Sequence, residues 1–362
     1  ARDGVSIGII LSGNSSSEES YLASVLAREI IQTNYIASSA SIEDLSLLEG
    51  LSNSLLALAP AKLNSLKKCD HFLIVGDVFH RHPPLARFIQ QCKFANRRNV
   101  KVVVVDSRKS ATSWFADTHL QPVPGTDTAL FLQLAFALHD RQGKEKAPKQ
   151  VLQVFKYLKK AGLPDLEKIT GVNQSAIAAA AKALCSGSHG AVLVTGGFGA
   201  LAGGASAVNA LNLAAHLGGV ERKILPLFTY GNSSGVFAVG QSIRNETKSG
   251  KDTYVPLAGI VKAVMNHELH GLLVFGEDLL ALLPTAGLKE ALHDLDFILC
   301  TGSFSNELTQ LADVVLPRAE WFERSGSVVD GEGKFDVLEA ICTPPGDARS
   351  DEEVLKRLIK KL

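Results

Sequence analysis

Short segments that are apolar throughout alternate with amphipathic helical patterns along this chain. A strand that is apolar on both sides suits a parallel sheet whose two faces are covered by helices. The sequence therefore predicts an α/β fold with mostly parallel sheets. The predicted strands are Val5–Leu11, His71–Val75, Lys101–Val105, Ala191–Val194, Lys223–Leu227, Leu272–Phe275, Phe297–Leu299 and Asp313–Leu316.

Length and one irregular segment predict more than one lobe. The 362 residues exceed the ~100–200 of an ordinary domain. Asp140–Gln150 is charged, contains Gly and Pro and shows no periodicity, which predicts an exposed linker or long surface loop. Predicted strands lie on both sides of it, so we expect at least two α/β lobes. Residues 17–31 and 351–362 are predicted helices, the second with its acids first and its bases last.

Composition excludes several classes of function. Lys+Arg and Asp+Glu both number 37, which leaves no basic surplus for nucleic acid. Aromatic residues make up only 6%, too few for base-stacking surfaces. No apolar run approaches the ~20 residues that span a bilayer, and the first residues lack a signal-peptide pattern. We expect a cytoplasmic protein that is not inserted into a membrane, and the missing initiator Met suits a fragment of a longer chain.

Cysteine and histidine spacings predict no metal site. The five Cys are far apart without a Cys-x-x-Cys pair, so we expect free thiols rather than a zinc or iron–sulfur site. His80 and His82 lack the i, i+4 spacing of a zinc-binding helix, as do His267 and His270. No third ligand accompanies either pair.

Polar residues follow several predicted strands, and in open α/β sheets ligands bind beyond those carboxyl ends. Asp106 ends one strand and Arg108 follows it. A carboxylate there can accept hydrogen bonds from a guanine edge or a ribose, and an arginine can bind a phosphate. Asp127 precedes a helical pattern and can either cap that helix or hold a ligand hydroxyl or base. For Asp106 and Arg108 the alternative is a turn-capping Asp and a surface Arg.

The glycine-rich segment Thr195–Gly204 (TGGFGALAGG) stands between a predicted strand and a helical pattern. Gly197-x-Gly199-x-x-x-Gly203 is close to a dinucleotide-binding fingerprint, in which glycines admit a phosphate to a helix N-terminus. The acidic residue expected at the end of the next strand is missing. Three interpretations stay open: an NAD(P) site, a site for another phosphate-bearing cofactor or its vestige, and close packing of helix against strand.

A series of short motifs runs through nearly the whole chain in a fixed order. The segments concerned are Ser12–Gly13, Ser17–Leu22, Leu26–Arg28, Thr33–Ile36, Gly76–Asp77, His82–Pro83, Val104–Arg108, Ala116–Leu120, Pro124–Asp127, Tyr230–Gly235, Gly276–Asp278, Leu311–Pro317, Glu323, Gly326, Glu332–Gly333 and Pro344–Arg349. In content and order this series resembles the motifs of the molybdopterin oxidoreductase superfamily, which includes formate dehydrogenases, nitrate reductases and the large iron–sulfur subunit of NADH:quinone oxidoreductase, respiratory complex I.

The resemblance implies a fold and two cofactor sites. It implies two Rossmann-like, doubly wound lobes, each binding one pterin guanine dinucleotide in the family. The first lobe would be discontinuous, residues 1–45 plus 186–350, and the second would be the insertion 46–185, with a terminal helix at 351–362. The residues that would bind the cofactors, or persist as vestiges of those sites, are Asp106, Arg108 and Asp127 for one guanosine end and Asn232, Gly276 and Glu277 for the other.

Departures from the family pattern bear on function. Catalytic members carry a Cys, selenocysteine, Ser or Asp metal ligand soon after the motif that Thr33–Ile36 resembles. Here the segment 37–44 reads ASSASIED, which has no thiol, and the formate-dehydrogenase ligand position falls near Glu43. The N-terminal iron–sulfur cysteines and the C-terminal domain of the family are also missing from this sequence.

Three functional hypotheses follow. The first is a relative of the large iron–sulfur subunit of NADH:quinone oxidoreductase. It would be a non-catalytic scaffold, without a cofactor of its own and inert alone. Partner subunits of a redox complex would hold it at the periphery of the inner membrane. The alternative is a fragment of an active formate dehydrogenase-type enzyme with molybdenum or tungsten held by molybdopterin guanine dinucleotide. The third is an NAD(P)-binding protein that uses Gly197–Gly203. A metal ligand near Ser38–Asp44 would distinguish the alternative from the first.

Overall fold

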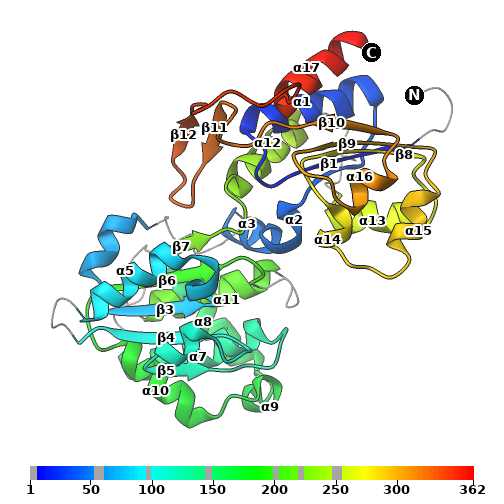
Figure 1. Ribbon diagram of the computed structural model, residues 1–362. Coiled ribbons are helices and arrows are strands. Elements are labelled where there is room, and N and C mark those ends of the chain that lie inside the picture. The colour runs from blue at the N-terminus through cyan, green and yellow to red at the C-terminus, as the bar shows by residue number, and fades with distance from the viewer. Residues whose placement is uncertain are drawn as a thin grey trace. The chain divides into compact units, whose positions relative to one another are not determined.

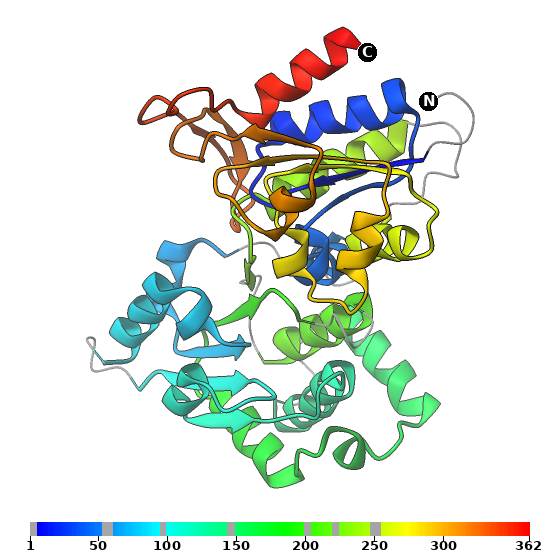
Figure 2. The same cartoon turned by 45° about the vertical axis from the view of Figure 1, so that its right-hand side comes forward.

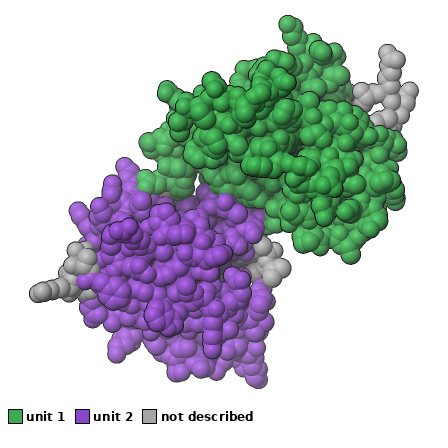
Figure 3. Space-filling model, in the orientation of Figure 1, with its two compact units in different colours: residues 1–42, 230–362 green, residues 43–229 purple. Residues whose placement is uncertain are grey.

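The computed structural model describes residues 6–52, 61–94, 99–142, 149–198, 204–218, 224–246 and 255–362. The chain forms two compact units, shown in different colours in Figure 3. Unit 1 comprises Ala1–Ile42 and Tyr230–Leu362, and unit 2 comprises Glu43–Thr229. The first unit is therefore discontinuous in sequence and the second is inserted into it.

Unit 2 contains a five-stranded, all-parallel sheet in the order β5-β4-β3-β6-β7. The chain forms β3, β4 and β5 outward on one side, then returns to add β6 and β7 on the other. This is the doubly wound arrangement, with its switch point between β3 and β6. The strands are β3 (His71–Val75), β4 (Lys101–Val105), β5 (Thr118–Leu120), β6 (Gly190–Thr195) and β7 (Ile224–Leu227).

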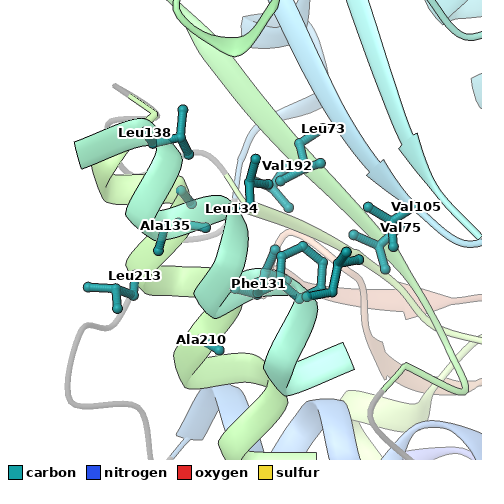
Figure 4. Packing of buried hydrophobic residues seen from close by; sticks show 14 of the residues in the cluster. Leu73, Val75, Val105, Phe131, Leu134, Ala135, Leu138, Val192, Ala210 and Leu213 are labelled. Carbon is teal, nitrogen blue, oxygen red and sulfur yellow. The ribbon is translucent and has the colours of Figure 1, made fainter. Parts of the chain in front are cut away.

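Helices cover both faces of the unit 2 sheet. On one face Phe131 and Leu134 of α7 pack toward Leu73, Val75 and Val192 of the strands (Figure 4). Full burial of one such Phe stabilises the fold by about 1.5–3 kcal/mol. Alternate residues of the same strands pack against α5 on the other face. The helices are α3 (Leu45–Ser52), η2 (Leu63–Lys68, a 3₁₀ helix), α4 (Val78–Arg81), α5 (Pro83–Phe94), α6 (Ala111–Phe115), α7 (Asp127–Gln142), α8 (Lys149–Ala161), α9 (Leu166–Thr170), α10 (Gln174–Leu184) and α11 (Gly204–Leu217).

Unit 1 contains a second five-stranded parallel sheet in the order β10-β9-β8-β1-β2. Its switch point lies between β1 and β8. The chain leaves for unit 2 after β2 and returns before β8. A separate antiparallel hairpin, β11–β12, follows the sheet in sequence. The strands are β1 (Ile7–Leu11), β2 (Ile36–Ser38), β8 (Gly271–Phe275), β9 (Phe297–Gly302), β10 (Val314–Pro317), β11 (Gly326–Val329) and β12 (Phe335–Leu338).

The unit 1 sheet is also covered on both faces. One face packs against α13 and α15, and the other against α1, η1 and α17. The C-terminal helix α17 lies beside α1 in both Figure 1 and Figure 2. The helices are α1 (Ser17–Val25), η1 (Leu26–Ile31, a π-helix), α2 (Ala40–Glu43), α12 (Ser233–Glu246), α13 (Leu257–Met265), α14 (Leu279–Leu282), α15 (Leu288–His293), α16 (Glu307–Leu311) and α17 (Asp351–Lys361).

The predicted fold class, two Rossmann-like α/β lobes with mostly parallel sheets, is confirmed. The predicted boundaries differ from the structure for residues 186–229, which the sequence places in the first lobe. β6 pairs with β3 and β7 with β6, so this segment completes the sheet of unit 2. The predicted linker Asp140–Gln150 begins inside α7 and ends inside α8, and its centre, 143–148, lies outside the described residues. No helix of the described ranges is long and apolar enough to cross a membrane.

Candidate functional site

A pocket lies at the switch point of unit 2, beyond the carboxyl ends of β3, β4 and β6. It encloses about 220 Å³. Each of these buried strands is followed by small or polar residues. Because the carboxyl ends of parallel strands meet at one edge of the sheet, these residues lie close together. The lining residues are Val75, Gly76, Asp77, Arg81, Val105, Asp106, Ser107, Arg108, Pro122, Pro124, Gly125, Asp127, Thr195, Gly196, Gly197 and Phe198.

Glycine at position 76 is required by the floor of this pocket. Its φ is +92°, and a Cβ atom there would lie 2.0 Å from Oγ1 of Thr195. The Thr195 hydroxyl donates a hydrogen bond to the carbonyl oxygen of Val75 at 3.2 Å. The ends of β3 and β6 therefore approach each other more closely than a side chain would allow.

Two carboxyl groups, Asp106 and Asp127, line the same pocket. The Asp106 Oδ1 atom accepts a hydrogen bond from the backbone N–H of Arg108 at 2.9 Å. Its Oδ2 atom is buried and has no hydrogen-bond partner within the described part of the chain. Asp127 is the first residue of α7, and burial raises the pKa of its carboxyl group. A buried oxygen without a donor costs free energy, so the pocket is suited to a ligand that supplies N–H or O–H groups.

The two arginines of the pocket differ in the partners of their guanidinium groups. Arg108 is exposed at the rim, next to Asp106. The Arg81 guanidinium donates through both terminal nitrogens to the Glu43 carboxylate, which also accepts a hydrogen bond from the Thr229 hydroxyl at 2.7 Å. The hydrogen bond from Arg81 lowers the pKa of Glu43. Arg108 is thus placed for an anionic ligand, whereas Arg81 neutralises a neighbouring carboxylate.

In the segment 37–44, where the motif resemblance implies a metal ligand, the carboxylates of Glu43 and Asp44 already have protein partners. Glu43 is held by Arg81 and Thr229, as described above. Asp44 is fully buried, and both of its carboxylate oxygens accept the backbone N–H of Thr229, at 3.1 and 3.0 Å. No group of three or more His, Cys, Asp or Glu side chains in the described ranges could hold a metal ion.

In unit 1 the corresponding switch point brings together Ser12, Ser39 and Glu277. The Ser39 hydroxyl donates to Oε1 of Glu277 at 2.6 Å and accepts the backbone N–H of Gly13 at 2.8 Å. Burial raises the pKa of Glu277. Gly276 has a φ of +71°, and a Cβ atom there would lie 2.5 Å from Cζ of Arg318. Gly276 and Glu277 therefore stand where the sequence placed them, at the end of β8.

Asn232 has a structural role within unit 1. Its side chain is fully buried, donates to the carbonyl oxygen of Ser15 at 2.7 Å and accepts the backbone N–H of Val329 at 2.8 Å. Both polar atoms are thus engaged, and we leave Asn232 out of the proposed binding residues.

The glycine-rich segment contributes to the unit 2 pocket through its first residues. Gly196 and Gly197 line the pocket, and the backbone N–H of Gly197 donates to the carbonyl oxygen of Glu43 at 2.7 Å. A Cβ atom on Gly204 would lie 2.7 Å from the side chain of Ser46, which supports close packing at the start of α11. Residues 199–203 lie outside the described residues.

Sequence reasoning missed the roles of Arg81, Ser39 and Thr195. Arg81 and Glu43 are 38 positions apart, and Ser39 and Glu277 are 238 apart. No local pattern marks such pairs. The positions of Ser39 and Thr195 at strand ends were the only available signal.

The fold defines a class of protein, the doubly wound α/β proteins, and in this chain a pocket lies at the switch point of one parallel sheet. The sequence model of a family described as Molybdopterin oxidoreductase matches residues 2–361. The chain therefore belongs to the molybdopterin oxidoreductase family, as its motifs predicted.

A curated relative lies among the formate dehydrogenases. The chain is 26% identical over 385 residues to the F420-dependent formate dehydrogenase subunit alpha of Methanocaldococcus jannaschii. The match covers 98% of this chain but 57% of the relative, so the chain spans little more than half the length of that protein. This match supports the predicted resemblance of the chain to formate dehydrogenase alpha subunits. The finer assignment to the large iron–sulfur subunit of NADH:quinone oxidoreductase stays a prediction.

Two solved structures share the fold. Acetylene hydratase from Pelobacter acetylenicus has a TM-score of 0.70 at 17% identity, and the match covers 98% of this chain and 55% of the hydratase. A component of the formyltransferase/hydrolase complex from Methylorubrum extorquens, solved with methylofuran, has a TM-score of 0.62 at 14% identity. That match covers 98% of this chain and 92% of the other.

Proposed function

We propose that this chain forms the two nucleotide-binding lobes of a formate dehydrogenase-like subunit. In this proposal the unit 2 pocket binds the guanosine end of a pterin guanine dinucleotide. The observation that carries it is the buried Oδ2 atom of Asp106, which has no donor among the described residues and belongs to a side chain that lines the same pocket as Asp127. Gly76, where a Cβ atom would lie 2.0 Å from Oγ1 of Thr195, lines the same pocket.

The chemistry of the pocket matches this ligand. A guanine edge carries N–H donors, and a ribose carries hydroxyl donors, which the two carboxylates can accept. Arg108 at the rim can pair with a phosphate oxygen through its guanidinium fork. When bound, a molybdenum or tungsten pterin centre supplies the redox chemistry. The residues of unit 2 would bind and orient its nucleotide end.

Calorimetric titration of the purified chain with GDP, and with ADP as the base control, tests the proposal. We expect Asp106→Asn and Asp127→Asn each to weaken GDP binding about tenfold or more, as expected for a charge-assisted hydrogen bond worth about 1.5–3 kcal/mol. Asp140→Asn, an exposed carboxylate outside the pocket, is the matched control. Because burial raises the pKa of Asp127, GDP affinity should fall as the pH is lowered through that pKa. Equal binding of GDP by all variants would contradict the proposal.

A second candidate is a structural subunit without a metal centre, the main hypothesis from the sequence. The pairing of Glu43 with Arg81 and Thr229 favours it, because that carboxylate already has partners at the expected ligand position. The Methylorubrum protein, matched over 92% of its length, supports the idea that such a two-lobed chain can be a component of a complex. At 14% identity the similarity concerns the fold alone, and the substrate of that complex is not part of this proposal.

Elemental analysis separates the two candidates. Stoichiometric molybdenum or tungsten in the purified protein, together with the fluorescence of an oxidised pterin, would contradict the structural subunit. GDP binding without metal would support nucleotide recognition by a non-catalytic subunit. Glu43→Gln is the informative variant. If Glu43 were a ligand, the metal content would fall, whereas in the structural subunit only the pairing with Arg81 would change.

A further inference from the structure

The β11–β12 hairpin of unit 1 has two edges with different surroundings. In its register Ser327 faces Val337 and Val329 faces Phe335. β11 packs against α1 and α12. β12 is the outer strand, and no third strand pairs with it in the part of the chain that the structure describes.

The inner edge is closed by side chains. The backbone N–H of Ser327 donates to Oε2 of Glu18 at 2.9 Å, and that of Val329 donates to Oδ1 of Asn232 at 2.8 Å. These two donors therefore point away from β12. In an antiparallel pair, residues opposite such outward-pointing groups have their own N–H and C=O groups directed to the other side. The backbone groups of Phe335 and Val337 thus face the outer edge of β12.

The outer edge is apolar and exposed. The exposed fractions of Phe335 and Val337 are 60% and 67%. Natural proteins usually protect such an edge with a Lys, a Pro or a bulge, because free backbone groups beside apolar side chains recruit another strand. β12 carries no Pro or Lys within Phe335–Leu338.

The charge around this edge restricts its partner. Between positions 320 and 339 there are six acidic residues and two basic ones. Arg324 is buried and ion-paired with Glu19, and Lys334 is hydrogen-bonded to Asp336, so acidic residues outnumber basic ones around this edge. In a second copy paired antiparallel about Asp336, the two Asp336 side chains would lie opposite each other, and like charges directly opposite are destabilising. The acidic residues are Glu320, Glu323, Asp330, Glu332, Asp336 and Glu339.

We propose that the outer edge of β12 binds an extended segment of a partner chain as an added strand. The segment alternates apolar residues, which contact Phe335 and Val337, with basic residues, which meet the acidic surround. This mode of recognition obtains affinity from main-chain hydrogen bonds and specificity from alternate side chains. The interaction is separate from nucleotide binding in unit 2, and neither proposal depends on the other.

Fluorescence polarisation tests the interaction with a labelled eight-residue peptide of alternating valine and lysine. Its lysine-to-glutamate counterpart is the charge control. We expect saturable binding of the basic peptide that weakens with salt. Val337→Pro removes only the outward N–H of β12, because proline is tolerated at an edge position, and it should weaken binding about tenfold or more. Val337→Thr retains the N–H and should bind nearly as well as the parent.

A second variant tests the proposal independently of whether the proline variant folds. Glu339 is exposed, so Glu339→Lys leaves the hairpin intact while it reduces the negative charge. Its affinity for the basic peptide should fall and its affinity for the acidic peptide should rise. Unchanged affinity in both Val337→Pro and Glu339→Lys would overturn the proposal, as would the absence of saturable binding. So would a dimer that Val337→Pro dissociates, because that result would identify a second copy as the occupant.

Discussion

His71, the first residue of β3, carries a fully buried imidazole that lies against Gly190. A Cβ atom on Gly190 would lie 2.0 Å from Nε2 of the ring. Burial lowers the pKa of His71 from 6.5 to about 4. The folded protein therefore keeps this ring neutral over a range in which the unfolded chain binds a proton.

We expect this difference to make unit 2 less stable in acid. Because the unfolded chain binds more protons between pH 6.5 and about 4, the free energy of unfolding decreases as the pH falls through that window, by up to about 3 kcal/mol. His71→Phe should remove this part of the pH dependence in urea unfolding between pH 4.5 and 7.5. His293→Gln, at an exposed histidine of unit 1, should leave it in place. An unchanged slope in His71→Phe would contradict the assignment.

At the scale of single residues, the sequence predicted positions better than partners. Asp106 and Arg108 were expected at a strand end and Asp127 at the start of a helix, and the structure brings all three into one pocket. Asn232 was expected to bind a ligand, yet its amide holds Ser15 and Val329. The second of these partners is 97 positions away. A motif specifies the residue at a strand end, whereas tertiary contacts decide what it binds.

Among the elements, apolar strands were predictable even at sheet edges, as β7 and β10 show, whereas short strands of mixed polarity were not. β2, β5 and β12 have only three or four residues with mixed polarity, so they lack an apolar run. α17 was predicted from the order of its charges, and Ser350 caps it by accepting the backbone N–H of Glu353 at 3.2 Å. Its own residues Val354 and Leu355 pack in the core of unit 1, but the ion pair that also holds the helix depends on a residue outside it. Asp351, fully buried, accepts a hydrogen bond from Nε of Arg318 at 2.6 Å.

Removing one partner of this buried pair should destabilise unit 1. Arg318→Met leaves the Asp351 carboxylate buried without its cation, which costs about 3–5 kcal/mol. The double variant Arg318→Met/Asp351→Asn removes both charges and should recover a large part of that loss. Urea unfolding monitored by amide exchange in α17 measures both. Lys356→Met, which removes an exposed cation of the same helix, is the control and should change little. A double variant no more stable than Arg318→Met would show that the pair is not what holds α17.

For the whole molecule, the apolar pattern predicted parallel sheets in two lobes, but it did not predict which of the two sheets each strand joins. Ala191–Val194 reads as a buried strand, and nothing in its composition selects a neighbour. The structure pairs this strand with β3, which places the later residues of the segment 186–229 in unit 2 as well. Thr229 then completes the unit, because its backbone N–H binds the carboxylate of Asp44. The chain thus enters and leaves unit 2 at adjacent points.

This closure predicts that unit 2 folds independently. A fragment of residues 43–229 contains the complete sheet, both of its helical layers and the pocket with Asp106 and Asp127. It should unfold cooperatively in urea and, if the proposed function holds, bind GDP with the affinity of the full-length protein. The fragment 46–185 lacks β6, β7 and α11, so one side of β3 and much of the surface of α7 would be exposed. That fragment should fail to unfold cooperatively, and a cooperative transition in it would restore the boundaries expected from the sequence.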